Sequence, residues 1–274
     1  MSKLEKAIRK ASVSRDKVVR RREGSDRVDG ALIDDTSDTL QGLAPVLYRL
    51  RAGHKHAPTA KTLEQHRIIT DGFSDEALTN YKMLRTRILQ QMNNNDWTTL
   101  AITAAHDGAG KSLTAINLAI TLASQGDHEI FLVDLDLRNP SIAEYFGFPQ
   151  EIAGLAAYLD GGIEMQDILW DVGVENLVVL PNRDRMSDSS ERITSRRMQK
   201  LIHDLKRASP KSIVIFDLPP VLTADDPVAI SPYVDGFLMV VSEGETPRDD
   251  LARAIDMLHS AKFLGLVLNK SGGR

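Results

Sequence analysis

Cysteine is missing from the sequence, and so is any long apolar run. Without cysteine, the 274-residue chain has no disulfide, no thiolate zinc site and no cysteine nucleophile, which suits a reducing cytosol. No apolar run approaches the roughly 18 residues that span a bilayer, and the charged N-terminus lacks the apolar segment of a signal peptide. The sequence also has no internal repeat and no low-complexity segment. We therefore expect a soluble, cytoplasmic globular protein.

Charge is distributed unevenly along the chain. Residues 1–27 carry ten Lys and Arg against four acids, a net charge of +6, which leaves about −10 for the remainder of a chain whose total is −4. An acidic body does not suggest general nucleic-acid binding. A basic tail can meet acidic lipids, an acidic partner or only solvent.

Residues 1–65 are expected to form an N-terminal arm of helix and linker. A charged helix with a narrow apolar stripe is predicted at 3–22, typical either of a solvated arm or of a helix that docks on a membrane surface or a partner. Further predictions are a linker at 23–38, a short helix at 39–51 and a polar linker at 52–62. His54 and His56 lack an obvious third ligand, so we expect them to be exposed rather than metal-binding.

From His66 onward the composition becomes that of a folded domain, at 66–274. Continuous apolar strands alternate with helices, which predicts an α/β fold with a mostly parallel sheet and helices on both faces. Strands are predicted at 67–70, 98–104, 129–135, 176–181, 211–217, 235–242 and 263–269. Helices are predicted at 75–92, 111–125, 140–146, 153–160, 191–208, 225–231 and 247–260.

A glycine-rich turn lies between a predicted strand and a predicted helix. It matches the P-loop pattern G-x-x-x-x-G-K-[ST], with Ala105 in place of the first glycine. Glycines let backbone N–H groups close around phosphate oxygens, and the start of the helix adds positive potential. Lys111 would neutralise the β- and γ-phosphates, and the Ser112 hydroxyl would hold Mg²⁺. The predicted phosphate-binding residues are Asp107, Gly108, Ala109, Gly110, Lys111, Ser112 and Leu113.

Two of the apolar strands are followed directly by aspartate. Nucleotide sites of α/β sheets lie at the carboxyl ends of strands, so Asp134 and Asp217 are predicted Mg²⁺ ligands. Asp136 lies on the same side as Asp134 if the strand persists, and one of the two could orient or deprotonate a nucleophile. Arg138 could pair with phosphate or with these acids. The alternative is that an aspartate at a strand end only caps the next turn.

These motifs, in this order, resemble those of the bacterial tyrosine kinases of capsule and exopolysaccharide assembly. The resemblance spans about residues 66–270 and includes Asp-x-Asp-x-Arg after one strand and Asp-x-Pro-Pro after another. It implies the fold of a broader P-loop class that contains Min- and Par-type ATPases. It implies catalytic roles for Lys111, Asp134 and Asp136. It also implies a metal site of Ser112, Asp134 and Asp217, and a purine contact for Asn269.

The same resemblance implies what the protein does and with what. The activity is transfer of the γ-phosphoryl group to tyrosine in exopolysaccharide or capsule synthesis, with ATP and Mg²⁺ as cofactors. The implied partner is a separate inner-membrane protein that sets polysaccharide chain length, a co-polymerase. A homo-oligomer is a further option, and no nucleic-acid partner is expected. The chain would act in the cytoplasm or at the inner membrane, held there through residues 1–22.

Two other functions stay open. The family's kinases usually end in a tyrosine cluster, whereas the five tyrosines here are scattered, which favours a nucleotide-gated regulatory ATPase or binding module. A positioning ATPase of the Min or Par type is the third candidate. His106 argues against it, because those ATPases carry a second lysine at this position. In the family's oligomerising helix, Glu-x-x-Arg-x-x-Arg is replaced here by Thr79, Lys82 and Arg85, so the pairing acid is missing.

Overall fold

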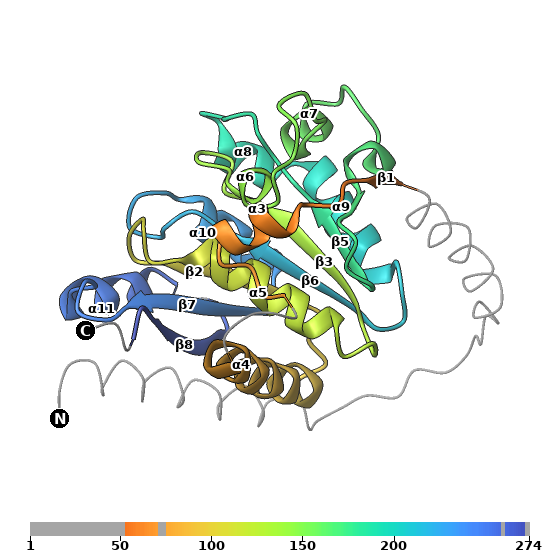
Figure 1. Cartoon of the computed structure of the whole chain (residues 1–274). Coiled ribbons are helices and arrows are strands. Elements are labelled where there is room, and N and C mark those ends of the chain that lie inside the picture. The colour runs from red at the N-terminus through yellow and green to blue at the C-terminus, as the bar shows by residue number, and fades with distance from the viewer. Residues whose placement is uncertain (1–52, 71–74, 259–260, 272–274) are drawn as a thin grey trace, which may run out of the picture.

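The computed structural model describes residues 53–70, 75–258 and 261–271, so the helices predicted at 3–22 and 39–51 and the linker at 23–38 lie outside it (Figure 1). Its strands are β1 (His54–Lys55), β2 (Thr99–Ala104), β3 (Glu129–Asp134), β4 (Trp170–Asp171), β5 (Leu177–Leu180), β6 (Ser212–Asp217), β7 (Gly236–Ser242) and β8 (Phe263–Asn269). Its α-helices are α3 (Ala60–Gln65), α4 (Asp75–Asn94), α5 (Lys111–Ala123), α6 (Ile142–Tyr145), α7 (Leu155–Leu159), α8 (Ser189–Ile193), α9 (Arg196–Arg207), α10 (Asp226–Ile230) and α11 (Arg248–Met257). Two 3₁₀ turns are η1 (Met165–Ile168) and η2 (Ser231–Tyr233).

An eight-stranded sheet runs through the molecule in the order β1-β4-β5-β3-β6-β2-β7-β8 (Figure 1). Neighbouring strands are parallel except for the pair β4 and β5. All residues of β2 and β6 are buried, which explains why these strands are continuous apolar runs. The predicted mostly parallel sheet is confirmed, and the six strands predicted between 98 and 269 are found within one residue of their expected bounds.

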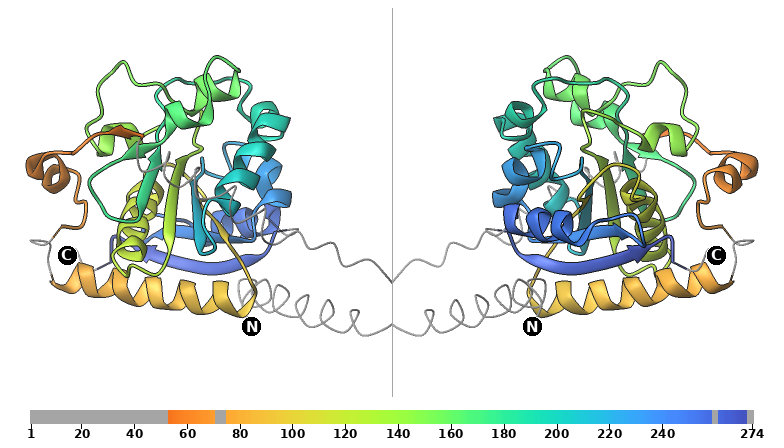
Figure 2. Two further views of the ribbon diagram at one scale, coloured as in Figure 1. Left: turned by 90° about the vertical axis from the view of Figure 1, so that its right-hand side faces the viewer. Right: turned by 90° about the vertical axis from the view of Figure 1, so that its left-hand side faces the viewer.

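Helices cover both faces of this sheet, with α5 on one side and α9 to α11 on the other (Figure 2). Successive residues of a strand pack on opposite faces of the sheet. Leu100 and Ile102 pack with α4 and α5, whereas Ala101 belongs to the core on the other face, with α9. The carboxyl ends of the parallel strands therefore share one edge, between the two layers. No described helix is long and apolar enough to cross a membrane.

Residues 54–65, expected to belong to a polar linker and arm, instead form β1 and α3. The His54 ring stacks on Trp170 with 4.8 Å between centroids, and the His56 ring stacks on Phe148 at 4.4 Å. The His56 backbone N–H also donates to the Asp171 carbonyl at 2.9 Å. These partners lie about a hundred residues away in the sequence, so no local pattern could reveal them. His54 is exposed as predicted, whereas His56 is half-buried.

Two other predicted elements differ from the structure. The strand expected at 67–70 is absent, because the Ile69 N–H donates to the Asn117 side-chain oxygen at 2.9 Å instead of to a neighbouring strand. The single helix expected at 191–208 is divided into α8 and α9. Ser195 caps α9, and its hydroxyl accepts from the Met198 N–H at 3.2 Å.

Candidate functional site

The glycine-rich turn joins β2 to α5 at the carboxyl edge of the sheet. Gly108 and Gly110 have φ of +77° and +87°, in the left-handed region that favours glycine. A Cβ on Gly110 would also stand 2.2 Å from the Asn269 side-chain nitrogen. That nitrogen donates to the Ala109 carbonyl at 2.8 Å, so Asn269 at the end of β8 holds the turn in place. Its predicted contact with a purine stays a prediction.

Lys111, the first residue of α5, is paired within the chain. Its ammonium lies 2.6 Å from Asp136 Oδ2, and the two residues are only 8% and 1% exposed. The other oxygen of Asp136 accepts from the Asn139 N–H at 2.9 Å. Burial alone would lower the pKa of Lys111, but the carboxylates of Asp217, Asp136 and Asp134 together raise it above its ordinary value. Lys111 is therefore a cation that lies among these three aspartates.

Asp134 and Asp217 are direct neighbours across the strands β3 and β6, where they are register partners. Both residues are fully buried. Asp134 Oδ2 accepts from the backbone N–H groups of Ser141 and Ile142 at 3.0 and 2.9 Å, so this oxygen holds the start of α6. The alternative considered from the sequence, that a strand-end aspartate caps the next turn, thus applies to one oxygen of Asp134. The other oxygen of Asp134 and both oxygens of Asp217 have no hydrogen-bond partner among the described residues.

The electrostatics of these two aspartates follow from their burial. Burial raises the pKa of Asp217 to about 6; Lys111 and the Ser112 hydroxyl, which lies near without hydrogen-bonding geometry, pull in the opposite direction. Burial and the charge of Asp217 raise the pKa of Asp134 well above its ordinary value, while the Ile142 N–H opposes this. A buried carboxylate oxygen that accepts no hydrogen bond is energetically unfavourable unless a cation binds to it.

The donor set suits Mg²⁺ more than an ion that needs a full protein cage. The described residues contain no group of three or more His, Asp or Glu side chains arranged around one metal position. Mg²⁺ commonly takes one or two carboxylates and fills its remaining positions with water and substrate phosphates. Asp134 and Asp217, with the buried Ser112 hydroxyl beside them, fit that pattern.

Arg138 does not pair with these acids, contrary to one of its predicted roles. Its Nε donates to Asp226 Oδ2 at 3.0 Å and to the Ser189 hydroxyl at 3.1 Å, and its Nη2 donates to Asp225 Oδ1 at 2.7 Å. The reason is that β3 ends at Asp134, so the following loop turns away and carries Arg138 toward α8 and α10. Asp226 is fully buried. The sequence gives little sign of this pairing, because Asp225-Asp226-Pro227 looks like an ordinary helix start.

Two other residues singled out from the sequence have partners elsewhere. His106 Nε2 lies 2.8 Å from Asp250 Oδ2 on α11, so this loop residue joins the turn to a helix. Arg85 on α4 donates to the Thr121 carbonyl at 3.1 Å. Among the interactions of the described residues, neither His106 nor Arg85 contacts the aspartates around Lys111.

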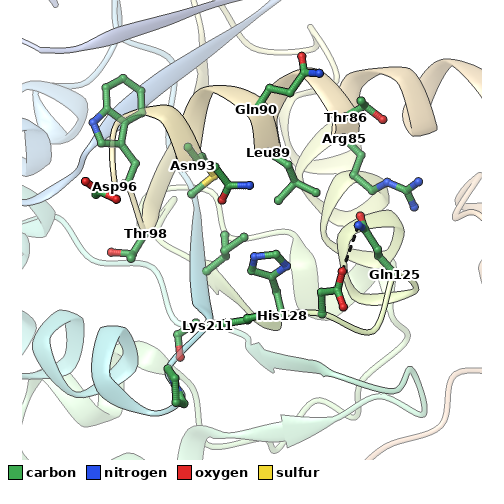
Figure 3. Close-up of a pocket in the computed structure, with 16 residues that line it drawn as sticks. Arg85, Thr86, Leu89, Gln90, Asn93, Asp96, Thr98, Gln125, His128 and Lys211 are labelled. Carbon is green, nitrogen blue, oxygen red and sulfur yellow. Dashed lines mark hydrogen bonds between the residues drawn. The ribbon is translucent and has the colours of Figure 1, made fainter.

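A separate hollow of about 700 Å³ opens at the opposite, amino-terminal edge of the sheet (Figure 3). Arg85, His128 and Lys211 line it, but Asp96 and Asp127 line it as well. Burial and the nearby Lys211 lower the pKa of His128. This mixed lining has no glycine turn and no helix start directed into it, so the phosphate-binding features all lie at the other edge.

The sequence and the fold are similar to those of known proteins. A family described as ParA, NUBPL iron-transfer P-loop NTPase, matches residues 97–273. The tyrosine-protein kinase CpsD of Streptococcus agalactiae is 31% identical over 192 residues, which cover 69% of this chain and 82% of CpsD. The crystal structure of the chimerical protein CapA2B2 has a TM-score of 0.67 at 28% identity, over 86% of this chain and 99% of that one.

A longer relative matches through only part of its length. The succinoglycan biosynthesis transport protein ExoP of Rhizobium meliloti is 29% identical over 218 residues, which cover 75% of this chain but 26% of ExoP. Together with the glycine turn, its lysine and the two strand-end aspartates, these similarities identify the chain. It belongs to the bacterial tyrosine kinase family of P-loop nucleotide-binding proteins.

Proposed function

We propose that this chain binds ATP with Mg²⁺ at the glycine turn and transfers the γ-phosphoryl group to a tyrosine hydroxyl. The observation that carries the proposal is the meeting of Lys111, Asp134, Asp136 and Asp217 at one edge of the sheet, where buried oxygens of Asp134 and Asp217 lack donors. Four charged side chains in so little space are disfavoured without a ligand, and they match what a metal-bound triphosphate requires.

Each residue then has a separate task in binding. The backbone N–H groups from Asp107 to Leu113 bind phosphate oxygens, and Lys111 exchanges Asp136 for the β- and γ-phosphates. The Ser112 hydroxyl and the free oxygens of Asp134 and Asp217 would hold Mg²⁺, which would supply positive charge to the phosphates.

The catalytic step depends mainly on positioning and charge. Once Lys111 has turned to phosphate, the Asp136 carboxylate has lost its ion-pair partner and is available as a base. It would accept the proton of the tyrosine hydroxyl as the phenolic oxygen attacks the γ-phosphorus in line with the leaving ADP. Exclusion of water from this buried edge strengthens the charge interactions that stabilise the transition state.

We also propose a role in exopolysaccharide or capsule synthesis together with a separate inner-membrane co-polymerase. The match to a quarter of ExoP supports this, because a domain like this one is there part of a longer transport protein. A cytoplasmic location is part of the proposal, with residues 1–22 as a basic segment that meets the inner membrane. Binding to vesicles with acidic lipids that is lost without residues 1–22 would support that contact.

Incubation with Mg²⁺ and γ-labelled ATP tests the activity, with Lys111→Ala as the matched control. The expected result is label on tyrosine in the wild-type chain and none in the variant. Release of labelled phosphate without labelled protein would instead support a plain ATPase. Absence of magnesium-dependent nucleotide binding in calorimetry would overturn both the kinase and the ATPase interpretation.

A further inference from the structure

The basic side chains of α9 fall into two groups by what they contact. Arg197 Nη1 donates to the Tyr158 carbonyl at 2.7 Å, and the Lys206 ammonium lies 3.5 Å from Asp235 Oδ2, so these two cations have partners in the fold. The other basic residues of the helix are exposed, and they are Arg196, Lys200, His203 and Arg207. The helix therefore presents a second, outward set of basic groups.

These four exposed residues form a straight row, here called the α9 stripe. They follow one another at spacings of four, three and four residues, and such positions share one face of a helix. At 1.5 Å per residue the stripe is about 16 Å long. The opposite face of α9 is buried, and the helix packs on β6 as an outer element of its layer (Figure 2). The stripe thus lies on the surface of the molecule.

The charges of the α9 stripe are largely unused within the fold. Lys200 pairs with Asp204, one turn further along the helix, but 69% of the lysine side chain is exposed. Such an exposed pair is weak and exchanges readily with other anions. Arg196 and Arg207 form no hydrogen bond or ion pair with the described residues. The stripe is consequently available to an anionic partner, on a chain whose remainder is acidic.

The surroundings of the stripe favour a narrow partner. Asp204 lies beside it on the helix, and Asp204 and, more weakly, Glu164 raise the pKa of Lys200. On the other side, the Gln199 amide donates to the Tyr233 hydroxyl at 3.0 Å, and both groups are uncharged. A broad anionic surface, such as a membrane with acidic lipids, would meet the flanking carboxylates as well as the stripe. A single acidic chain segment can follow the stripe without meeting them.

The chain itself contains a segment of matching charge. Residues 23–38 hold six acids, at 23, 26, 29, 34, 35 and 38, against one arginine, a net charge of −5. This segment lies outside the described residues. At up to about 3.5 Å per residue, Asp34 and Asp38 are at most about 14 Å apart, which is close to the length of the stripe. The acids of 34–38 therefore match the stripe in both charge and spacing.

The connection to the sheet is long enough for this contact. Fourteen residues, 39–52, separate the acidic segment from Gly53, where the described structure begins, and they span up to about 50 Å. β6 is four strands from β1 in the sheet, about 19 Å, and the helix layer adds about 10 Å. The same connection keeps the segment at a high local concentration, which offsets the weakness of each exposed ion pair.

We propose that residues 23–38 of this chain bind along the α9 stripe, with their carboxylates against Arg196, Lys200 and Arg207. Lys200 exchanges the exposed Asp204 for a carboxylate of the segment. Because residues 1–22 directly precede the segment, its binding brings that basic stretch to the α9 side of the molecule. This contact does not depend on the nucleotide site, so its failure would leave the proposed kinase activity untouched.

A distance measurement between two spin labels on the full-length chain tests the contact. The chain has no cysteine, so Ala31→Cys and Gln199→Cys place the labels at defined positions and remove no charge. We expect the fraction of label pairs closer than about 25 Å to fall at least about twofold when salt is raised from about 0.05 M to about 1 M, because salt screens exposed charges. An equal fraction at both salt concentrations would overturn the inference.

Charge reversal on α9 tests which residues hold the segment. Lys200→Glu with Arg207→Glu should reduce the close label pairs at low salt to their level at high salt. Lys61→Glu with Arg87→Glu is the matched control, because it makes the same change in net charge at exposed positions of α3 and α4. This control should alter the fraction by less than about 1.2-fold. Equal effects of the two double variants would show that only net charge matters, which contradicts a specific contact.

Reversal of both partners provides a rescue. Asp34→Lys with Asp35→Lys should lose the close label pairs alone, but should regain at least about half of them when combined with the double reversal on α9. A structural effect of the α9 substitutions would not be corrected by changes in another segment. Failure of the rescue would therefore contradict direct pairing between the segment and the stripe.

Other partners for the two charged surfaces give different results. Close label pairs that vanish when labelled chains are mixed with excess unlabelled protein would mean contact between copies. Their loss in a chain that begins at Glu23 would mean that residues 1–22 make the contact. Binding to acidic vesicles that requires Lys200 and Arg207, with no close pairs in solution, would assign the stripe to a lipid surface. Each of these three results would overturn the inference.

Discussion

The Lys111 ammonium and the Asp136 carboxylate lie 2.6 Å apart, so the lysine of the glycine turn has an anionic partner before any nucleotide arrives. In the proposed function, phosphate oxygens would therefore compete with a side chain of the same protein. The exchange would have two results at once: the lysine would gain a phosphate, and the carboxylate would become free. Nucleotide binding and activation of the proposed base would be linked in this way through a single ion pair.

Replacement of Asp136 by Asn should strengthen nucleotide binding while it weakens phosphoryl transfer. Without the competing carboxylate, affinity for ATP in the absence of magnesium should rise by about tenfold, since a charge-assisted hydrogen bond contributes on the order of 1–2 kcal/mol. Calorimetry of the two proteins measures this. Asp204→Asn, which removes the partner of Lys200 on the surface of α9, should leave the affinity unchanged. Weaker binding in Asp136→Asn would show that Asp136 does not compete.

Asp217 should make the nucleotide-free protein less stable as pH rises from 4 to 6. An unfolded aspartate has a pKa of about 3.9, whereas that of Asp217 is about 6 in the fold. Between these values the folded state keeps a proton that the unfolded state has lost, so the stabilisation present at low pH disappears as pH rises through 6. The loss amounts to about 3 kcal/mol.

Urea unfolding of wild type and Asp217→Asn across this pH range isolates the effect, because the variant should lack this part of the pH dependence. The metal-bound nucleotide requires the ionised carboxylate. The affinity of the protein for nucleotide with magnesium should consequently fall as pH drops below about 6, whereas the free energy of unfolding of the nucleotide-free protein should rise. Identical pH profiles for the two proteins would contradict the role of Asp217.

Gly108 and Gly110 should respond differently to alanine. Both have positive φ, so each substitution strains the backbone by about 1–2 kcal/mol. At Gly108 a Cβ meets nothing within 4 Å, whereas at Gly110 it stands 2.2 Å from the Asn269 side chain. Gly110→Ala should thus be the more destabilising in urea unfolding and should lose nucleotide uptake. Adding Asn269→Ala should restore the part of the stability that the steric contact removed, while the backbone strain remains. Equal losses of stability for both glycine variants would rule out the steric contribution.

Arg138 should contribute more to stability than Arg192, although their side chains are 39% and 35% exposed. Arg138→Ala leaves the fully buried Asp226 without its cation, which should lower the free energy of unfolding by about 2 kcal/mol. Among the residues that the structure describes, Arg192 pairs only with the exposed Asp160 and Asp188, so its loss should matter clearly less. The double variant Arg138→Ala with Asp226→Asn should recover part of the loss in the same unfolding assay.

The segment from His54 to His66 should behave as part of the folded domain. A chain that begins at Gly53 keeps the stacking of His54 and His56 on Trp170 and Phe148 and should be as stable as full length. A chain that begins at Arg67 exposes those aromatic faces and should unfold at lower urea concentration. Equal midpoints for the two shortened chains would instead support the boundary predicted at residue 66.

The sequence was most informative where local chemistry decides the structure. Buried parallel strands are typically continuous apolar runs, so β3 and β6 and the aspartates at their carboxyl ends could be located to within a residue. The strands β1 and β4 have two residues each and no apolar pattern, and their pairing depends on aromatic rings brought together by the fold. No periodicity marks such elements.

The same division applies to the site. The glycine turn and its lysine follow a fixed spacing, so they could be found from the sequence alone. Which acid would pair with Lys111, and which with Arg138, depends on how the loop after Asp134 turns.

The hydrogen bond from Asn269 to the Ala109 carbonyl joins residues 160 positions apart in the chain. During synthesis the glycine turn leaves the ribosome long before the last strand does, and domains fold as their chain emerges. Until β8 has been translated and added to the sheet, the turn lacks the side chain that supports it. A nascent chain should for that reason remain unable to take up nucleotide, and any phosphorylation should begin only after β8 has joined the sheet.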